Sequence, residues 1–309
     1  MARSIIIDTD PGQDDAIALL MALVSPELNV LGVTTVAGNV PQPQVTENAL
    51  AVLELVGSNV PVFRGCARPI LRELYTAEYV HGPTGIDGAD LPEPSGSEAD
   101  QHGVDFIIET CRDRDDVSIV ALGPLTNLGV ALAKEPMLAQ HVQEVLWMGG
   151  AVFEGGNTTP AAEFNAYVDP HAAHIVLSSG IPLTMFPLDV THQALVLPEH
   201  LERIRAIGSS AAEAVAGMLA YYERWDVEKY GFPGAPLHDP CPIAFLLDPD
   251  LFVGKHVSAA IEVCSEQSAG ALLADWWGVS GSVPNVTIMH TVAAPGFFDL
   301  VIETLSRPE

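Results

Sequence analysis

Positive charge is scarce in this 309-residue sequence, which has 13 lysines and arginines against 40 aspartates and glutamates. The formal net charge of −27 argues against binding to nucleic acids or anionic membranes, because both kinds of binding need clustered cations. We therefore expect no nucleic-acid partner and no membrane partner. A surface this acidic suits a neutral or cationic ligand, or one recruited through a bound cation. The alternative is that the acidic residues serve only to keep the protein soluble.

Cysteines are few, and long apolar runs are missing. The four cysteines form no CxxC pair, so neither a disulfide framework nor a zinc site is expected. The apolar run 5–7 follows only four residues, which leaves no room for a signal peptide, and no run is long enough to span a bilayer. These features predict a cytoplasmic protein with free thiols.

Apolar β-branched runs alternate with helical patterns in the first half of the chain. Strands are expected at 4–7, 30–36, 117–122 and 144–148, and helices at 16–24, 45–56 and 125–133. Strands without polar alternation are buried on both faces, as in parallel sheets flanked by helices. We predict an α/β fold with a mostly parallel, doubly wound sheet, in a single domain spanning 1–309.

The remaining segments are less regular. Segment 64–100 is rich in glycine, proline and acidic residues and is expected to be a long surface loop, and 153–165 is also irregular. After residue 198 the pattern is helical and ends in strand-like 257–263 and 286–290. In a doubly wound sheet, ligands bind beyond the carboxyl ends of the strands, so the segments after the strands should meet at one crevice.

The first of these segments, 8–15, holds four carboxylates in the sequence DTDPGQDD. Such a density is strongly repulsive unless a cation neutralises it, and hard oxygen ligands select Ca²⁺ or Mg²⁺. Asp14 and Asp15 could instead cap a helix, but capping does not explain Asp10 in the same turn. The motif also imitates the strand-DxD of haloacid-dehalogenase-like phosphatases, although Gly12 stands where those enzymes have Thr or Val.

DTDPGQDD resembles the D-x-D-P-G-x-D-D signature of the inosine–uridine nucleoside hydrolases. Further matches to that family follow in the same order over almost the whole chain, at 36–39, 122–127, 148–150, 162–165 with 169–170, and 237–239. The resemblance implies the nucleoside hydrolase fold and the hydrolysis of the N-glycosidic bond of ribonucleosides to free base and ribose. It also implies a Ca²⁺ cofactor and a homodimer or homotetramer.

The resemblance assigns roles to matching residues. Ca²⁺ would be bound by Asp10, Asp15, Asp239 and the backbone carbonyl of Leu122, and Asp10 would also be the general base toward a calcium-bound water. The ribose hydroxyls would be held by Asp14, Asn39, Asn157, Glu163 and Asn165. Met148 would line the sugar pocket.

The leaving nucleobase must accept a proton or be stabilised as an anion. His238 is the first candidate donor, because histidine titrates near neutral pH, and His81 is the second. Each could instead be an ordinary structural histidine, His81 in a surface loop and His238 at a helix start. Asp226 and Tyr230, on a helix before His238, could close the nucleobase pocket or lie on the helix surface.

The two histidines resemble the non-specific or pyrimidine-accepting branch of the family more than the purine-specific branch. Besides the phosphatase, two further alternative functions stay open. One is a catalytically silent nucleoside- or ribose-binding protein, which intact Asp10 and His238 argue against, since binding alone needs no base. The other is a hydrolase of a modified nucleoside.

Overall fold

A computed structural model describes residues 2–307, except for the side chains of 223–226. The described strands form one nine-stranded sheet in the order β3-β2-β1-β4-β5-β6-β9-β7-β8. Their bounds are β1 (Arg3–Thr9), β2 (Leu28–Thr35), β3 (Val62–Arg64), β4 (Val117–Ala121), β5 (Glu144–Met148), β6 (Leu183–Phe186), β7 (Phe252–Ile261), β8 (Leu272–Asp275) and β9 (Val286–Val292).

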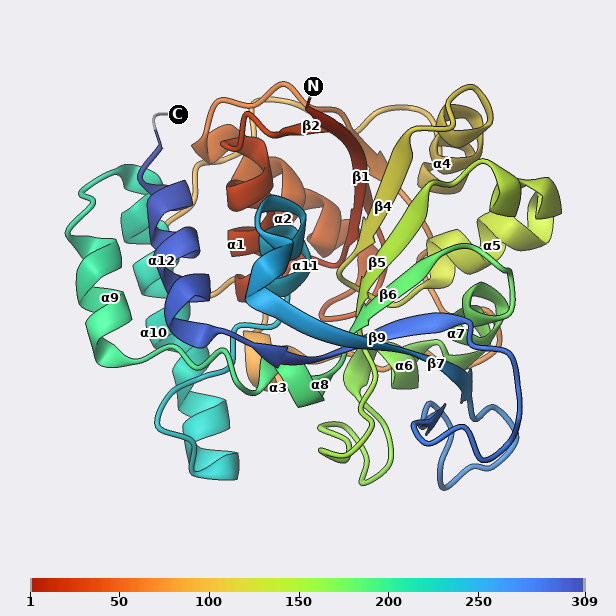
Figure 1. Cartoon of the computed structure of the whole chain (residues 1–309). Helices are drawn as coiled ribbons and strands as arrows, with labels where there is room; N and C mark the ends of the chain where they lie inside the picture. The colour runs from red at the N-terminus through yellow and green to blue at the C-terminus, as the bar shows by residue number, and fades with distance from the viewer. Residues whose placement is uncertain (1, 308–309) are drawn as a thin grey trace.

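Helices cover both faces of the sheet. Helices α1, α9, α10, α11 and α12 lie on one side and α4, α5 and α7 on the other (Figure 1). The helix bounds are α1 (Gln13–Leu23), α2 (Gln42–Leu55), α3 (Glu78–His81), α4 (Gly103–Arg112), α5 (Thr126–Lys134), α6 (Phe164–Val168), α7 (Pro170–Leu177), α8 (Leu188–Thr191), α9 (Pro198–Arg205), α10 (Ser210–Tyr230), α11 (Pro240–Leu247) and α12 (Ala294–Leu305), with 3₁₀ turns at Pro136–Gln140 and Pro249–Leu251.

The central strand β1 shows why the sheet needs two layers of helices. Ile5 and Ile7 pack into the apolar core on the α1 side, whereas Ile6 packs into the core on the α4–α5 side. Successive side chains of a strand point to opposite faces, so an unbroken apolar strand must be covered on both. The predicted α/β fold with a mostly parallel sheet is confirmed.

The prediction for segment 64–100 was wrong in one respect. The segment is not only a surface loop, because it contains the short helix α3 and the buried residues Ala77 and His81. Its glycines and prolines suggested exposed turns, but residues 77 and 79–81 of the segment line a pocket at the carboxyl ends of the strands. The carboxyl end of β1 points toward the side of the molecule where Figure 1 shows α3, α6 and α8. Both chain termini lie on the opposite side.

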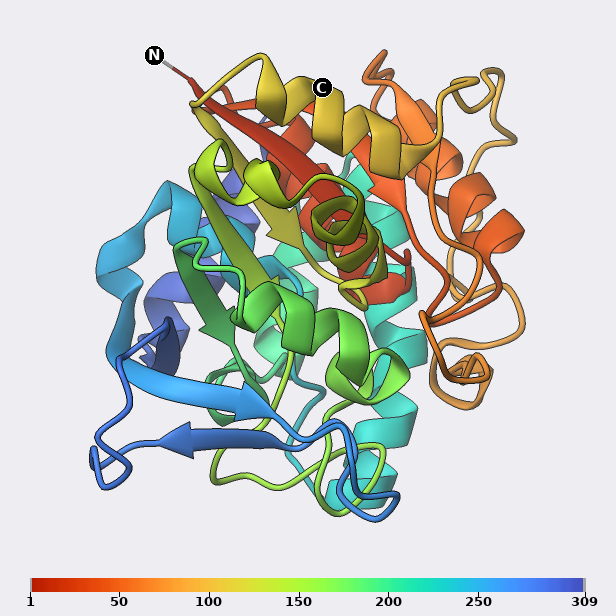
Figure 2. The ribbon, with the colours of Figure 1, turned by 90° about the vertical axis from the view of Figure 1, so that its right-hand side faces the viewer.

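The C-terminal part of the sheet departs from the parallel pattern. Strand β9 pairs parallel with β6, but β7 pairs antiparallel with both β9 and β8. Figure 2 looks onto the side of the molecule that carries α4, α5 and α7, and the C-terminal strands, in blue, lie at the lower left. The strand expected at 257–263 begins earlier, at Phe252, because alternation with exposed residues hid its first half.

Helix α10 packs against the loop after α3 through two glycines. A Cβ atom at Gly217 would collide with the carbonyl oxygen of Gly88, and one at Gly88 would come within 2.7 Å of the Gly217 carbonyl oxygen. Gly88 also has a φ of +109°, which disfavours other residues. The backbones of helix and loop therefore touch directly, and neither position has room for a side chain.

Membrane insertion finds no support in the helices. In the part of the chain that the structure describes, none combines the length and the apolar character needed to cross a bilayer.

Trp147 on β5 tests how far the core supports the site. Its ring is fully buried, and its Nε1 donates to the carbonyl oxygen of Gly123, 3.2 Å away, next to Leu122. We expect Trp147→Phe to lower the free energy of unfolding by about 2 kcal/mol, from a smaller ring and an unpaired carbonyl. The control is Leu71→Ala, at a 71% exposed position, which should change the free energy of unfolding by less than about 0.5 kcal/mol in the same urea titration. Equal effects would contradict the assignment.

Candidate active site

The loop between β1 and α1 forms the floor of the site. Strand β1 ends at Thr9, and α1 begins at Gln13 after the Pro11-Gly12 turn. The backbone N–H of Gly12 donates to Asp15 Oδ2 at 2.9 Å, and the Thr9 hydroxyl donates to Asp15 Oδ1. Asp15 thereby ties the helix start to the strand end. Gly12 is required, because a Cβ there would come within 2.6 Å of His81 Nδ1.

Three buried carboxylates gather beside this loop. Asp14, Asp15 and Asp239 each place an oxygen within 4.8 Å of the others, and Asp239 comes from the start of α11, far away in sequence. Burial and the charges of Asp14 and Asp15 raise the pKa of Asp239 well above its ordinary value. A cation would relieve this repulsion, and three carboxylates are a donor set that fits a hard metal ion.

Asp10 lies next to the three-carboxylate group but outside it. Its Oδ2 accepts the backbone N–H of Asn39 at 2.7 Å, while the Asn39 side chain donates to Asp15 Oδ2 at 3.2 Å. A Cβ at Gly38 or Gly123 would collide with the Asp10 carboxylate, so two motif glycines exist to admit it. Burial first, and Asp15 second, raise its pKa well above the ordinary value.

Asn165 connects two of the strand ends. Its side-chain amide donates to the carbonyl oxygens of Leu122, at 2.7 Å, and Met148, at 3.0 Å. These residues follow or end β4 and β5, which are neighbours in the sheet. Asn165 itself lies in the first turn of α6, so this helix is fixed directly above the strand ends.

Glu163 caps α6 from inside the site. Its carboxylate accepts the backbone N–H groups of Gly150, Asn165 and Ala166 at 2.8, 2.8 and 3.1 Å. Burial nevertheless dominates and raises its pKa to about 7. The Asn157 side chain accepts the N–H of Phe164 at 2.9 Å, which joins the 153–163 loop to the same helix.

Both predicted histidines are buried. His81 stacks on Tyr222 at 5.6 Å between ring centroids, and burial lowers its pKa to about 4. His238 places Nδ1 2.7 Å from the Thr191 hydroxyl, and burial, followed by the charge of His192, lowers its pKa well below the ordinary value. His81 is therefore not the exposed surface-loop histidine of the alternative interpretation, whereas His238 does stand at the start of α11.

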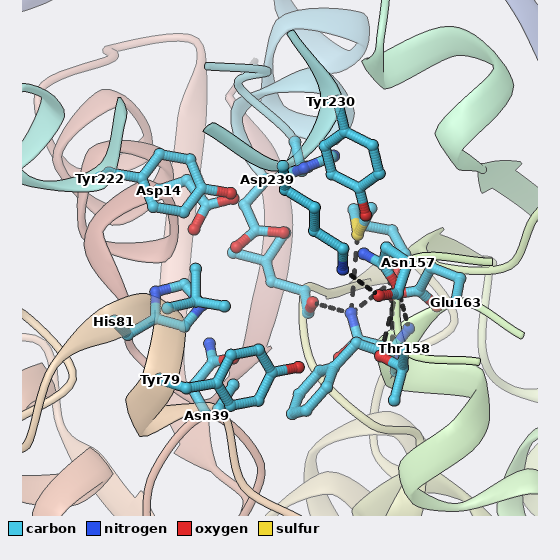
Figure 3. A pocket seen from close by; sticks show the side chains of 18 residues that line it. Asp14, Asn39, Tyr79, His81, Asn157, Thr158, Glu163, Tyr222, Tyr230 and Asp239 are labelled. Carbon is cyan, nitrogen blue, oxygen red and sulfur yellow. Dashed lines mark hydrogen bonds between the residues drawn. The ribbon is translucent and has the colours of Figure 1, made fainter. Parts of the chain in front are cut away.

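A pocket lies above the carboxylates (Figure 3). Most predicted site residues line it: Asp14, Asn39, His81, Leu122, Met148, Asn157, Glu163, Asn165, Tyr230, His238 and Asp239. Asp10 and Asp15 lie buried just beneath, and the side chain of Asp226 lies outside the described residues. The structure thus brings together the segments that the sequence analysis expected to converge.

Sequence reasoning missed seven residues that line the pocket. Four are polar, Tyr79, Thr158, Tyr222 and Lys229, and three are apolar, Ala77, Val80 and Phe164. Lys229 donates to the carbonyl oxygen of Asn157 at 2.8 Å, across the pocket from α10. Tyr222 could have been found, because it precedes Tyr230 by eight residues on the same helix, close to two turns plus a residue. Tyr79 lies in the four-residue helix α3 and Thr158 in an irregular segment, and neither stretch is long enough to carry a periodic signal.

The order of the motifs and the geometry of the pocket can be compared with known proteins. The model of the family described as inosine-uridine preferring nucleoside hydrolase matches residues 5–299. The chain belongs to this family. The resemblance inferred from the motifs is confirmed, and so is the predicted enzyme class, at the level of the family.

Similar proteins span its full length. The pyrimidine-specific ribonucleoside hydrolase RihA of Shewanella sp. (strain MR-7) is 46% identical, over 99% of this chain and 97% of that protein. An uncharacterized protein of Schizosaccharomyces pombe is 48% identical over 98% and 99% of the two chains. The structure of a purine-preferring ribonucleoside hydrolase from Gardnerella vaginalis superposes with a TM-score of 0.92 at 30% identity, covering 98% of both chains.

The carboxylate group predicts a stability response to cations. We expect added Ca²⁺ to stabilise the chelator-treated protein by about 2.7 kcal/mol at one hundred times the Kd. The gain would be measured as a rise in the melting temperature. Asp239→Asn should abolish most of this shift, because it removes one of the three clustered carboxylates. Asp250→Asn, at an exposed position, should retain it. A shift of equal size in both variants would contradict a cation site here.

Glu163 predicts a pH dependence. Its folded pKa of about 7 lies above the ordinary value of 4.5, so its contribution to stability is fully present below pH 4.5 and is lost as the pH rises through 7. The loss amounts to about 3 kcal/mol. In chelator, the stability of wild type relative to Glu163→Gln should fall by this amount between pH 4.5 and 8, followed by urea unfolding. A difference independent of pH would contradict the raised pKa.

Proposed function

We propose that the chain hydrolyses the N-glycosidic bond of ribonucleosides to free nucleobase and ribose, with pyrimidine nucleosides preferred. One observation carries the proposal: Asp14 and Asp239, two of the three clustered carboxylates, line the same pocket as Asn39 and Asn165. A sugar bound there meets both hydrogen-bonding groups for its hydroxyls and concentrated negative charge.

That charge suits the chemistry. Breaking an N-glycosidic bond builds positive charge on the ribose, in a transition state that resembles an oxocarbenium ion. Carboxylates and carboxamide oxygens fixed around the sugar stabilise this charge without reorganising during the reaction. Asp14, Asn39, Asn157, Glu163 and Asn165 would hold the hydroxyls, and Met148 would pack against the sugar. A substrate without the 2′-hydroxyl would leave buried polar groups unpaired and react poorly.

Asp10 is the proposed general base. It is buried beneath the pocket and held by Asn39 N–H through one oxygen, so its carboxylate cannot rotate freely. A base fixed in this way can take the proton from the attacking water as that water approaches the anomeric carbon. The glycines at 38 and 123 keep the space around it free of side chains.

Asp10, Asp15, Asp239 and the Leu122 carbonyl are the proposed ligands of a Ca²⁺ ion. An oxygen-only donor set supports a hard cation over softer metals. When bound, such an ion supplies positive charge that lowers the pKa of water and orients it. Asp14 belongs to the same carboxylate group, which supports a place for the ribose diol directly beside the ion.

The nucleobase would lie near the aromatic and histidine side chains. His238 is our candidate for the proton donor to the leaving base, and its contact with Thr191 orients the ring. Tyr230 lines the pocket and stacks on Phe232, which supports its role in closing the nucleobase side. The same role is retained as a prediction for Asp226.

Pyrimidine preference rests on the relatives. The bacterial relative at 46% identity carries the name of a pyrimidine-specific enzyme, whereas the purine-preferring enzyme is 30% identical.

A dimer or tetramer of this chain is also proposed, and exposed Trp277, Val279 and Val283 near β8 support an interface between copies. A place in the cytoplasm is proposed as well, in line with the free cysteines.

Ribose release tests the function. We expect free ribose from uridine and cytidine, with a higher kcat/KM than from inosine, and loss of the product when a chelator removes the cation. Asp10→Asn should lower kcat by about 10²–10⁴-fold, the usual contribution of a general base. Its unfolding transition should stay as cooperative as that of the wild type, which shows that the variant is folded.

The same assay distinguishes the alternatives. Binding of nucleosides without any ribose release would favour the silent binding protein, and release only from modified bases would favour a specialised hydrolase. Hydrolysis of phosphate esters that is lost in Asp8→Asn but kept in Asp10→Asn would instead support the phosphatase.

A further inference from the structure

Gln13 holds His81 from two directions. The Gln13 side chain is fully buried in the first turn of α1. Its Nε2 donates to the carbonyl oxygens of His81, at 2.9 Å, and Asp87, at 3.1 Å. Its Oε1 lies 2.7 Å from Nδ1 of the His81 ring. One amide therefore contacts both the backbone and the imidazole of the same histidine.

These contacts fix the orientation of the amide. Backbone carbonyl oxygens accept hydrogen bonds and cannot donate them, so both of them require the NH₂ end of Gln13. The oxygen end must then face the histidine ring. An amide oxygen is also only an acceptor, so the hydrogen between Oε1 and Nδ1 must belong to the imidazole.

The tautomer of His81 follows. A neutral imidazole carries one N–H, and here it sits on Nδ1, which leaves Nε2 as an acceptor. The ring is held in place by stacking on Tyr222 and by the close approach of Gly12. Figure 3 shows His81 at the wall of the pocket, opposite Glu163.

The geometry points to a specificity role for this arrangement: Gln13 is a positioning residue that locks His81 as an acceptor, and His81 selects nucleobases that present an N–H donor. The inference rests on the proposed function for its substrate class. Uracil offers the N–H of its N3, and cytosine offers its exocyclic amine. An acceptor nitrogen gives no proton to the leaving base, so His81 is not the proton donor, and that task falls to another group such as His238.

The tautomer can be measured without any substrate. In protein labelled with ¹⁵N-histidine, the His81 signals, assigned by their loss in His81→Leu, should show a protonated Nδ1 and an unprotonated Nε2. Gln13→Leu should shift His81 toward the other tautomer or a mixture. A protonated Nε2 in the wild type would overturn the inference, whatever the enzyme hydrolyses.

Testing whether His81 acts as an acceptor requires a nucleoside whose base lacks the N–H donor and is no larger than uracil. The ribonucleoside of pyrimidin-2-one is smaller than uridine and cytidine and has no N–H on its base. We expect its kcat/KM to rise relative to uridine, by about tenfold, when His81→Leu removes the acceptor. Comparing the ratio between wild type and variant cancels the intrinsic difference in leaving ability. An unchanged ratio would overturn the inference.

Gln13→Leu should also raise the kcat/KM of the pyrimidin-2-one ribonucleoside relative to that of uridine, because the His81 ring is no longer held in one tautomer. The matched control is Gln42→Leu, which also removes a buried amide but one bonded to Thr35 and Thr46, away from His81. Its ratio and its His81 signals should equal those of wild type. Equal changes in both Gln variants would overturn the assignment to Gln13. If no nucleoside releases ribose, the proposed function fails, while the ¹⁵N signals still decide the tautomer.

Discussion

The repulsion among buried carboxylates at the end of β1 is the constraint on which the site depends. Asp10, Asp14, Asp15 and Asp239 are all nearly inaccessible to water, and burial raises the pKa of both Asp10 and Asp239. Like charges in so small a buried volume destabilise the fold unless donors and a cation offset them. The surrounding segments supply such donors, from the Thr9 hydroxyl to the backbone and side-chain amide groups of Asn39.

The rest of the pocket follows from the need to bring those donors together. The segments that follow β1 and β2 supply these donors, and the parallel sheet brings the carboxyl ends of β1, β2, β4 and β5 to the same side of the molecule. Asn165 then links the ends of β4 and β5, and Glu163 anchors α6 above them. Asn165 and Glu163 each make structural hydrogen bonds as well as a proposed substrate contact, so this part of the pocket is already ordered before a ligand enters.

Sequence reasoning predicted this convergence because the strands are apolar throughout and the motifs stand at their ends. It could not find β3 or β6, which are only three and four residues long, and it missed the burial of α3 within an otherwise polar segment. It expected Asp10 to lie with Asp15 and Asp239. In the structure Asp14 is the third member of that group, and Asp10 instead accepts the backbone N–H of Asn39. Contacts between residues distant in sequence, such as that of Lys229 Nζ with the carbonyl oxygen of Asn157, leave no local pattern to detect.

The contact between Gly88 and Gly217 limits how substrate range can change in descendants of this chain. Because two backbones meet there without side chains, α10 and the loop after α3 cannot drift apart or closer by gradual substitution. A larger residue at either position would displace helix α10, which carries Tyr222, or the loop that carries Asp87. The carbonyl oxygen of Asp87 accepts a hydrogen bond from Gln13. New base preferences are therefore more accessible through exchange of single pocket-facing residues than through remodelling of the wall, and a library for altered specificity should leave both glycines intact.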